Sequence, residues 1–153
     1  MKYILIVCTG NTCRSPMAAY LLRKMIKEHG ATDTVEVDSA GLGAFGGDPI
    51  SENALIALQE IGIDASEHRA KLLTRYAAAQ ADTIYVMTEA HRRTIESALP
   101  EASNQIKVIG VSDPYGLELS AYRNCLNEIK AFFQAELPYI ISEKDENRID
   151  ESI

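Results

Sequence analysis

The sequence predicts an α/β fold: a single three-layer αβα domain in which a small parallel sheet of about four strands lies between two layers of helices. Two observations support this prediction. Short apolar runs alternate along the chain with amphipathic helical patterns, and such alternation favours a parallel sheet covered by helices on both faces. The chain has 153 residues, a length that suits one domain with a sizeable core, and no internal repeat or linker divides it.

Four segments have the composition of strands. Residues 2–7 and 83–87 are continuous apolar runs rich in β-branched or aromatic side chains, as expected of strands that are buried on both faces. Residues 34–39 alternate between apolar and polar side chains, and residues 106–110 form a further short run rich in β-branched residues. We therefore expect a strand at each of these four places.

Three segments repeat apolar residues at helical spacing, at 17–26, 54–61 and 122–140. The end of the chain, residues 141–153, is polar and acidic instead, and we expect it to fray or to be disordered. The sequence thus predicts one domain over residues 1–140, followed by an acidic C-terminal tail at 141–153.

Charge and hydropathy exclude several classes of partner. The net charge of −7 provides no basic surface for nucleic acid, and we interpret the basic "HRR" at residues 91–93 as a solvated helix face. No apolar run approaches the roughly 20 residues that a membrane helix needs. The three cysteines are odd in number and two share one loop, so a disulfide scaffold is not expected. A monomer in the reducing cytoplasm fits these features best.

The stretch "VCTGNTCRSP", residues 7–16, joins the first predicted strand to the first predicted helix. Ser15 falls where a helix N-cap is expected, and Pro16 would then occupy the first helical position, where its missing N–H costs nothing. Exposed N–H groups and the helix dipole converge at such a point and favour binding of an anion such as phosphate. Cys8 would lie at the floor of this site.

The residue types in the loop suit nucleophilic attack on phosphorus. The field at a helix N-terminus favours the thiolate form of a cysteine such as Cys8, which is the nucleophilic form. The guanidinium of Arg14 can grip two phosphoryl oxygens and stabilise the charge of the transition state. Gly10 permits close approach of the backbone, and Asn11 tolerates a left-handed turn. The alternative, a buried core thiol beside a surface arginine, does not explain the strand, loop and helix around them.

At this point the chain resembles the low-molecular-weight protein tyrosine phosphatase family, whose signature is a Cys-x5-Arg-Ser-Pro loop near the N-terminus. The segments "DSAG" (38–41), "SEHRA" (66–70) and "DPYG" (113–116) follow in the family's order and at about its spacing. The resemblance therefore covers nearly the whole chain up to the acidic tail. It implies the fold of these phosphatases and a phosphocysteine intermediate on Cys8.

By this resemblance Asp113 is the general acid, which phosphoryl transfer requires because the leaving group must depart with a proton. The resemblance also implies a hydrogen-bond network of Asn11, Ser15, Ser39 and His68 that holds the loop open, with Ser15 stabilising the thiolate. Each residue has a simpler explanation: an Asp-Pro turn, a strand end, or an ordinary histidine. The histidines have no metal-ligand spacing, so we expect no zinc site and no cofactor.

Thr12 separates two substrate classes within the family. Tyrosine phosphatases of the family usually carry a bulky aliphatic residue at this position, whereas the bacterial protein arginine phosphatases carry threonine, in a loop that matches this chain throughout. Tyr115 would supply a flat wall, and the second aromatic residue common in tyrosine-specific members is replaced by Gly116. We therefore predict a cysteine-dependent phosphatase of phosphoarginine in proteins, with phosphotyrosine as the alternative substrate.

Substrate contacts are expected from the loop and its surroundings: Thr9, Gly10, Asn11, Thr12, Cys13, Ser15 and Tyr115. Cys13 is either a resolving thiol that pairs with the nucleophile on oxidation or a small loop filler, and Cys125 is expected in the core. Two further classes stay open. An arsenate reductase of similar fold needs more cysteines for its relay, and a phosphocarrier domain would not need Arg14 or Asp113.

Overall fold

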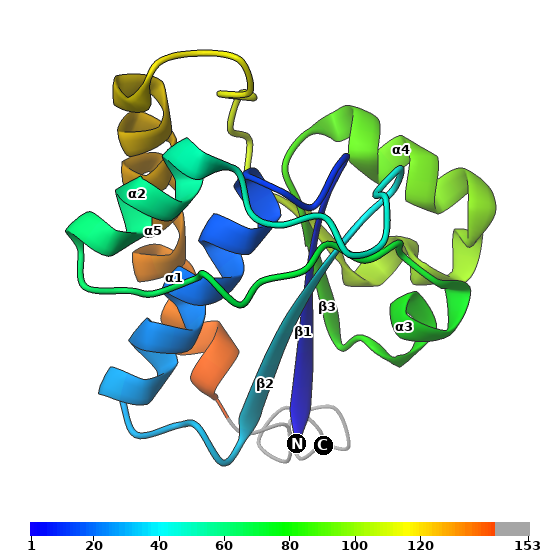
Figure 1. Cartoon of the computed structure of the whole chain (residues 1–153). Coiled ribbons are helices and arrows are strands. Elements are labelled where there is room, and N and C mark those ends of the chain that lie inside the picture. Colours follow the sequence, from blue (N-terminus) through cyan, green and yellow to red (C-terminus); the bar gives the residue numbers. More distant parts are fainter. Residues whose placement is uncertain (143–153) are drawn as a thin grey trace.

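The computed structural model describes residues 1–142 and contains a four-stranded, all-parallel sheet with strand order β2-β1-β3-β4. The prediction of a small parallel sheet in an α/β fold is confirmed. The strands are β1 (Lys2–Cys8), β2 (Val35–Gly41), β3 (Thr83–Val86) and β4 (Ile106–Val108). β1 lies at the centre of the sheet, so its carboxyl end, at Cys8, is surrounded by the loops of its neighbours (Figure 1).

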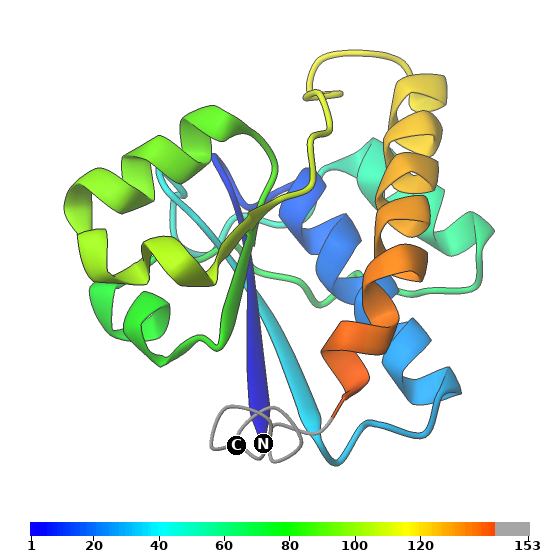
Figure 2. The ribbon, with the colours of Figure 1, turned by 180° about the vertical axis from the view of Figure 1, so that it is seen from behind.

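Helices cover both faces of the sheet, and the reverse view shows the same two layers (Figures 1 and 2). One layer consists of α1 (Arg14–Glu28), α2 (Glu52–Glu60) and α5 (Leu119–Ile141). The other layer consists of α3 (Arg75–Gln80), α4 (Glu89–Ala98) and the 3-10 helix η1 (Pro100–Gln105). The three-layer arrangement follows from the apolar composition of the inner strands, because both faces of such a sheet must be covered.

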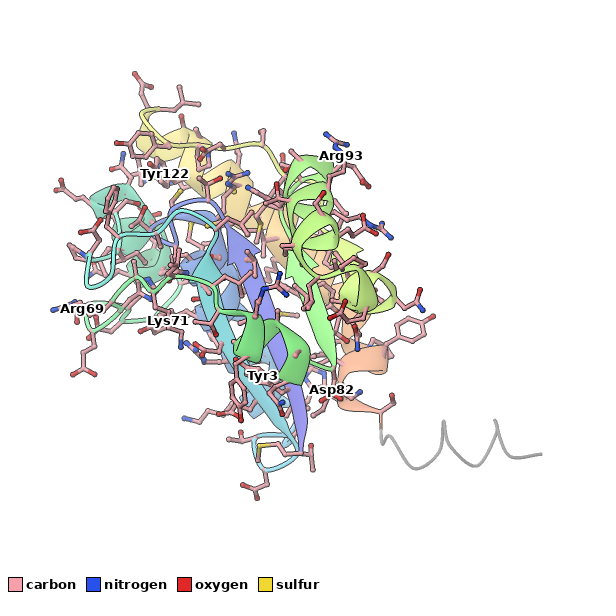
Figure 3. All side chains as sticks on the ribbon, turned by 90° about the vertical axis from the view of Figure 1, so that its right-hand side faces the viewer. Tyr3, Arg69, Lys71, Asp82, Arg93 and Tyr122 are labelled. Carbon is pink, nitrogen blue, oxygen red and sulfur yellow. The ribbon has the colours of Figure 1, made fainter. Side chains whose placement is uncertain are left out.

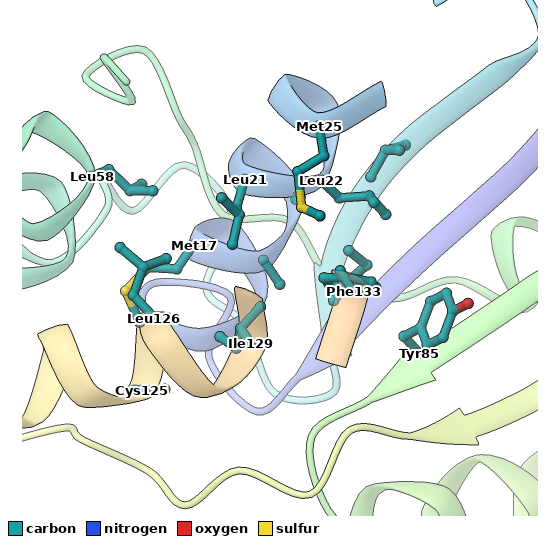
Figure 4. Close-up of a cluster of buried hydrophobic side chains, with 14 of the residues drawn as sticks. Met17, Leu21, Leu22, Met25, Leu58, Tyr85, Cys125, Leu126, Ile129 and Phe133 are labelled. Carbon is teal, nitrogen blue, oxygen red and sulfur yellow. The ribbon is translucent and has the colours of Figure 1, made fainter. Parts of the chain in front are cut away.

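The apolar run of β1 supplies both halves of the core. Ile4 and Ile6 pack with α1 and α5, whereas Leu5 and Val7 point to the opposite face and pack with α3 and α4. Figure 4 shows side chains of α1 and α5, among them Phe133, interdigitating on the first face. All four β1 side chains are fully buried, and each such aliphatic side chain contributes about 1.5–3 kcal/mol relative to exposure.

The strand order places the topological switch point between β1 and β3, where open α/β sheets form their binding crevice. The helix after β1 packs on one face of the sheet and the helix after β3 on the other, so the two connections diverge from neighbouring strands. In open α/β sheets ligands bind at such a divergence, beyond the carboxyl ends of the strands. The Cys8 side of the molecule is therefore the expected place for a site.

Three elements differ from what the sequence predicts, in their ends, their burial or their presence. The strand predicted at 106–110 stops at Val108, because Gly110 adopts a φ of 83° and turns the chain away. The helix inferred at 91–93 exists as α4, but His91 is buried rather than solvated, since it packs under the loop that follows β1. The short α3 has no apolar periodicity, and its start depends on Thr74, whose side chain accepts a hydrogen bond from the Ala77 N–H.

The prediction that Ser15 caps the first helix is wrong. α1 begins at Arg14 with Cys13 at the N-cap, and no side chain caps it. Ser15 is one residue inside the helix, where its hydroxyl is used by other groups of the loop. Pro16 still lies in the first turn, whose N–H groups have no partner within the helix.

The end of the chain is described only in part. α5 continues to Ile141, the first residue of the predicted acidic tail, and the tail from residue 143 on lies outside the described residues. Among the helices of residues 1–142, none combines the length and the apolar composition that crossing a bilayer requires.

Candidate active site

Residues 8–15, which we call the Cys8 loop, connect β1 to α1 at the crevice. Asn11 has a φ of 56°, so the left-handed turn expected there is present. Gly41, at the end of β2, lies against this turn: a Cβ at position 41 would lie 2.6 Å from the Thr9 carbonyl oxygen and 3.0 Å from the Asn11 nitrogen. The neighbouring strand can approach the loop this closely because residue 41 has no side chain.

The Cys8 sulfur is buried and accepts or shares two hydrogen bonds within the loop. Its Sγ lies 2.9 Å from the Ser15 hydroxyl and 3.3 Å from the Asn11 backbone N–H. The Asn11 side-chain amide donates to the Ser15 hydroxyl oxygen at 2.8 Å, which leaves the hydroxyl proton of Ser15 free to point at the sulfur. Two donors thus converge on Cys8, an arrangement that stabilises an anionic sulfur.

Asn11 joins the Cys8 loop to two other segments. Its amide also donates to the Ser39 hydroxyl at 3.0 Å, its side-chain oxygen accepts from the Lys71 N–H at 3.0 Å, and its carbonyl accepts from the His68 Nε2 at 2.7 Å. Hydrogen bonds therefore join Asn11 to Ser15, Ser39 and His68, the residues for which the family resemblance implies a network. Asn11 and Ser15 are fully buried, so their side chains support the loop and do not line its mouth.

His68 is neutral in this network. Burial lowers its pKa below the ordinary histidine value, and the hydrogen bond to the Asn11 carbonyl opposes that effect only in part. Since a carbonyl only accepts, the proton of the neutral ring must be on Nε2. Lys71, which forms an ion pair with Asp38, contributes through its backbone N–H; this contact was not foreseen.

Arg14 is 5% exposed and faces the loop that follows β4. Its Nη1 donates to the Val111 carbonyl at 3.4 Å, and its Nη2 lies 3.5 Å from the Asp113 Oδ2. Among the described residues none pairs with its Nε. A buried guanidinium with a donor to spare is suited to grip an oxyanion.

Asp113 belongs to residues 111–117, which we call the Asp113 loop. Its side chain is about half exposed, at 49%, and its Oδ1 accepts from the Tyr115 N–H at 3.0 Å in a local turn. The same oxygen lies 3.7 Å from the Cys13 sulfur. The structure therefore brings Cys8, Arg14 and Asp113 to one end of the sheet, as the sequence predicted.

The other two cysteines are buried thiols. Burial, followed by the nearby Cys8 and Asp113, raises the pKa of Cys13 to about 12, and burial raises that of Cys125 to about 12. Both therefore stay protonated at neutral pH. Cys125, on α5, lies in the hydrophobic core as predicted, and its sulfur lies 3.9 Å from the Ser112 carbonyl oxygen.

The remaining predicted contact residues lie around the mouth of the site. Thr12 is half-buried, and its carbonyl accepts from the Ser51 N–H at 2.8 Å. Thr9 is exposed, Gly10 is half-buried, and Tyr115 is 72% exposed. These positions leave the side chains of Thr12 and Tyr115 accessible to a substrate.

Sequence reasoning missed three residues that support the site: Gly41, Ser51 and His91. The quoted "DSAG" contained Gly41, so a signal for it existed, but nothing near Ser51 or His91 indicated a role. Burial raises the pKa of Tyr122, which lies toward one end of the molecule, whereas Tyr3 and Asp82 lie toward the other end (Figure 3). Within residues 1–142, no group of three or more His, Cys, Asp or Glu side chains is arranged to hold a metal ion.

The model of the family described as "Low molecular weight phosphotyrosine protein phosphatase" matches residues 3–145. The chain is 38% identical over 146 residues, 92% of this chain and 97% of the relative, to the "Probable low molecular weight protein-tyrosine-phosphatase EpsP" of Ralstonia nicotianae. It is 37% identical over 136 residues to the "Protein-arginine-phosphatase" of Geobacillus stearothermophilus, covering 83% of this chain and 88% of the relative.

The solved structures that resemble the chain likewise include an arginine phosphatase and a tyrosine phosphatase. The YwlE arginine phosphatase from Geobacillus stearothermophilus superposes with a TM-score of 0.79 at 35% identity, over 88% of this chain and 89% of that chain. The low molecular weight protein tyrosine phosphatase from T. tengcongensis superposes with a TM-score of 0.85 at 36% identity, over 91% of this chain and 99% of that chain.

Proposed function

The chain belongs to the low molecular weight phosphotyrosine protein phosphatase family, and we propose that, as an enzyme of this family, it hydrolyses phosphoarginine in proteins. The proposal has two parts. The first assigns roles in phosphoryl transfer to Cys8, Arg14 and Asp113, and the second assigns the substrate class on the basis of Thr12.

In the first step the Cys8 thiolate attacks phosphorus, a P–S bond forms, and the P–N bond to the substrate guanidine breaks. The Arg14 guanidinium and the backbone N–H groups of the Cys8 loop hold the phosphoryl oxygens, whose charge they stabilise in the transition state. Asp113 gives its proton to the departing nitrogen. Its position beside Arg14, at 3.5 Å, supports this role because both groups then face the same phosphoryl group.

In the second step water attacks the phosphocysteine. Asp113, now a carboxylate, accepts a proton from this water, the P–S bond breaks, and inorganic phosphate leaves with the thiolate restored. The hydroxyl of Ser15 and the N–H of Asn11 stabilise that thiolate as the leaving group. The chemistry of both steps uses protein groups and water.

The observation that carries the substrate assignment is the loop "CTGNTCRSP" with threonine at position 12. Thr12 is half-buried at the mouth of the site, where an aliphatic side chain would offer apolar contact to a phenyl ring. A hydroxyl offers a hydrogen bond to a guanidinium, and the Asp113 carboxylate offers a charge-assisted one. The likeness to a protein named an arginine phosphatase points in the same direction.

Phosphotyrosine is the second candidate substrate. Tyr115 is exposed beside Asp113 and could stack on a phenyl ring, and the EpsP relative is named a tyrosine phosphatase. Arsenate reduction by a cysteine relay is disfavoured, because the Cys125 thiol is buried in α5 with a raised pKa.

The direct test is kcat/KM for a phosphoarginine peptide and a phosphotyrosine peptide of the same flanking sequence. We expect the phosphoarginine peptide to be preferred, and Cys8→Ser to reduce turnover of both peptides to background. A wild type that prefers phosphotyrosine would replace the arginine assignment with the tyrosine one. Substantial activity in Cys8→Ser would overturn the mechanism itself.

Thr12→Ile tests the residue on which the substrate assignment depends. The substitution adds apolar bulk and removes one hydroxyl while Cys8, Arg14 and Asp113 stay unchanged. We expect kcat/KM for phosphoarginine to fall by roughly tenfold to a hundredfold, the equivalent of about 1–3 kcal/mol for a lost polar contact, while kcat/KM for phosphotyrosine holds or rises. Thr12→Ser, which keeps the hydroxyl, is the matched control. An unchanged ratio of the two substrates in Thr12→Ile would contradict the role of Thr12.

A further inference from the structure

His91 is a buried histidine whose ring reaches the Cys8 loop from α4. Its Nε2 lies 2.9 Å from the Thr9 hydroxyl, and the residue is 7% exposed. Among the residues that the structure describes, none pairs with its Nδ1. Buried polar groups are usually hydrogen-bonded, and the one hydrogen bond that the His91 ring makes among the described residues is to Thr9, the residue after the proposed nucleophile.

The position of His91 follows from the fold. Thr88 caps α4, its hydroxyl accepting from the His91 N–H, so His91 occupies the first turn of that helix. α4 follows β3, the strand beside β1, and therefore begins at the crevice where the Cys8 loop also begins. His91 thus approaches the loop from the opposite side to His68, which holds the Asn11 carbonyl.

The ring of His91 is neutral at pH 7, since burial, and after it the nearby Arg14, lowers its pKa below the ordinary histidine value. A neutral ring carries one proton. If that proton were on Nδ1, a buried N–H would have no acceptor among the described residues. Buried donors without a partner are rarer in proteins than buried acceptors without one. The proton therefore belongs on Nε2, where it is donated to the Thr9 hydroxyl oxygen.

Thr9 is consequently held at two atoms. Its carbonyl accepts from the Gly43 N–H at 2.9 Å, and its hydroxyl oxygen accepts from His91. Thr9 is exposed, so no packing around its own side chain would otherwise fix it. Because Thr9 is bonded to Cys8, its orientation sets the direction of the first backbone N–H of the loop.

We propose that His91 is a positioning residue that holds Thr9 and so sets the geometry in which the Cys8 loop binds the phosphoryl group. The inference rests on the proposed function, in which this loop is the phosphate site. It does not depend on whether the substrate is phosphoarginine or phosphotyrosine, because His91 acts on the part of the loop that every phosphoryl group would share.

The test is a double-mutant cycle between His91 and Thr9, read by the inhibition constant of inorganic phosphate and by KM for para-nitrophenyl phosphate. We expect His91→Leu and Thr9→Val each to raise both constants about threefold to tenfold, the size expected for one lost hydrogen bond. The double variant should be no worse than either single variant, because each removes the same contact. His91→Gln and Thr9→Ser, which keep the donor and the acceptor, should recover most of the binding that His91→Leu and Thr9→Val lose.

A merely structural role of His91 would give a different pattern. A smaller fraction of folded enzyme lowers the apparent kcat but leaves KM and the inhibition constant of phosphate unchanged. That result in His91→Leu would overturn the proposal. So would effects that multiply in the double variant, or a His91→Gln variant as weak as His91→Leu. Thr9 is exposed, so Thr9→Val keeps the test decisive even where His91→Leu does not fold: an unchanged phosphate constant in Thr9→Val overturns the proposal.

His29, on the exposed end of α1, supplies the control variant His29→Leu, for which no change is expected. A wild-type enzyme that phosphate does not inhibit would overturn the proposed phosphate site and this inference with it. Normal inhibition of the wild type with unchanged constants in the variants would overturn this inference alone.

Discussion

The Cys8 loop and the Asp113 loop lie side by side but are held in very different ways. In the Cys8 loop, Cys8, Asn11, Arg14 and Ser15 are each at most 5% exposed, and hydrogen bonds tie the loop to β2, to the segment around residue 70 and to α4. In the Asp113 loop the Asp113 side chain is about half exposed. Tyr115 and Leu117 are 72% and 58% exposed, and their N–H groups donate within the loop, to Asp113 and to Pro114. The loop contacts the rest of the protein through Val111, Asp113 and the Leu117 carbonyl.

This difference assigns different tasks to the two loops. A loop whose donors already converge before substrate arrives loses little conformational entropy on binding, and its dipoles need no reorganisation in the transition state. A loop whose outer side chains, such as Asp113 and Tyr115, are exposed can adjust to the leaving group and to the incoming water. We therefore infer that binding strength resides in the Cys8 loop and that proton transfer resides in the Asp113 loop.

Asp113→Asn gives the largest expected effect and tests the second half of this division. Removing the general acid should lower kcat by about 10²- to 10⁴-fold, while the free energy of unfolding changes by less than about 1 kcal/mol, since the side chain is half exposed. Steady-state kinetics and urea unfolding measure the two quantities. A large loss of stability would mean that the Asp113 loop is as tightly integrated as the Cys8 loop, and retained kcat would remove Asp113 from the proton transfer.

Gly41→Ala tests the preformed state of the Cys8 loop without touching a reacting group. The new Cβ would lie 2.6 Å from the Thr9 carbonyl oxygen and 2.9 Å from the Ala44 Cβ, so backbone must move. We expect about 1–3 kcal/mol lower stability, as for other overpacked sites, together with weaker binding of phosphate.

Gly43→Ala is the matched control for that substitution. It lies two residues further along, and its nearest atom, the Thr9 carbonyl oxygen, is 4.0 Å from the ideal Cβ position. Equal effects of the two substitutions on phosphate binding would contradict the close packing of β2 against the Cys8 loop.

The smallest expected effect concerns pH. His68 and His91 both have a pKa lowered by burial, so both are neutral in the folded and unfolded protein above the ordinary histidine pKa. As pH falls below that value, the unfolded chain binds protons that the folded one does not, and stability declines toward pH 5.5. Urea unfolding from pH 7.5 to 5.5 should show this decline, with a smaller slope in His68→Gln. A free energy of unfolding that increases as the pH falls from 7.5 to 5.5 would contradict the assignment of these histidines as buried and neutral.

The sequence anticipated most of what is local. Continuous apolar runs located the inner strands at 2–7 and 83–87, because a strand buried on both faces has no other composition available. The contiguous stretch 7–16 indicated a loop between a strand and a helix, with a left-handed turn at Asn11, because strand end, turn and helix start follow one another within a few residues. The wrong assignment there, Ser15 as the N-cap, arose because capping preference considers only the start of the helix, whereas the Ser15 hydroxyl interacts with Cys8 and Asn11.

By itself, then, the sequence determined the layers of the fold, the position of the Cys8 loop between β1 and α1, and the residue types from which the proposed catalytic site is built. Only the tertiary structure decided three contacts. Arg14 forms an ion pair with Asp113, His91 forms a hydrogen bond with Thr9, and the Cys8 loop packs against Gly41. These contacts join residues from different connections of the sheet. They depend on the strand order β2-β1-β3-β4 and on the face of the sheet that each connecting helix covers. Hydrophobic periodicity predicts neither of these, because it indicates whether a side chain is buried but not which residue it packs against.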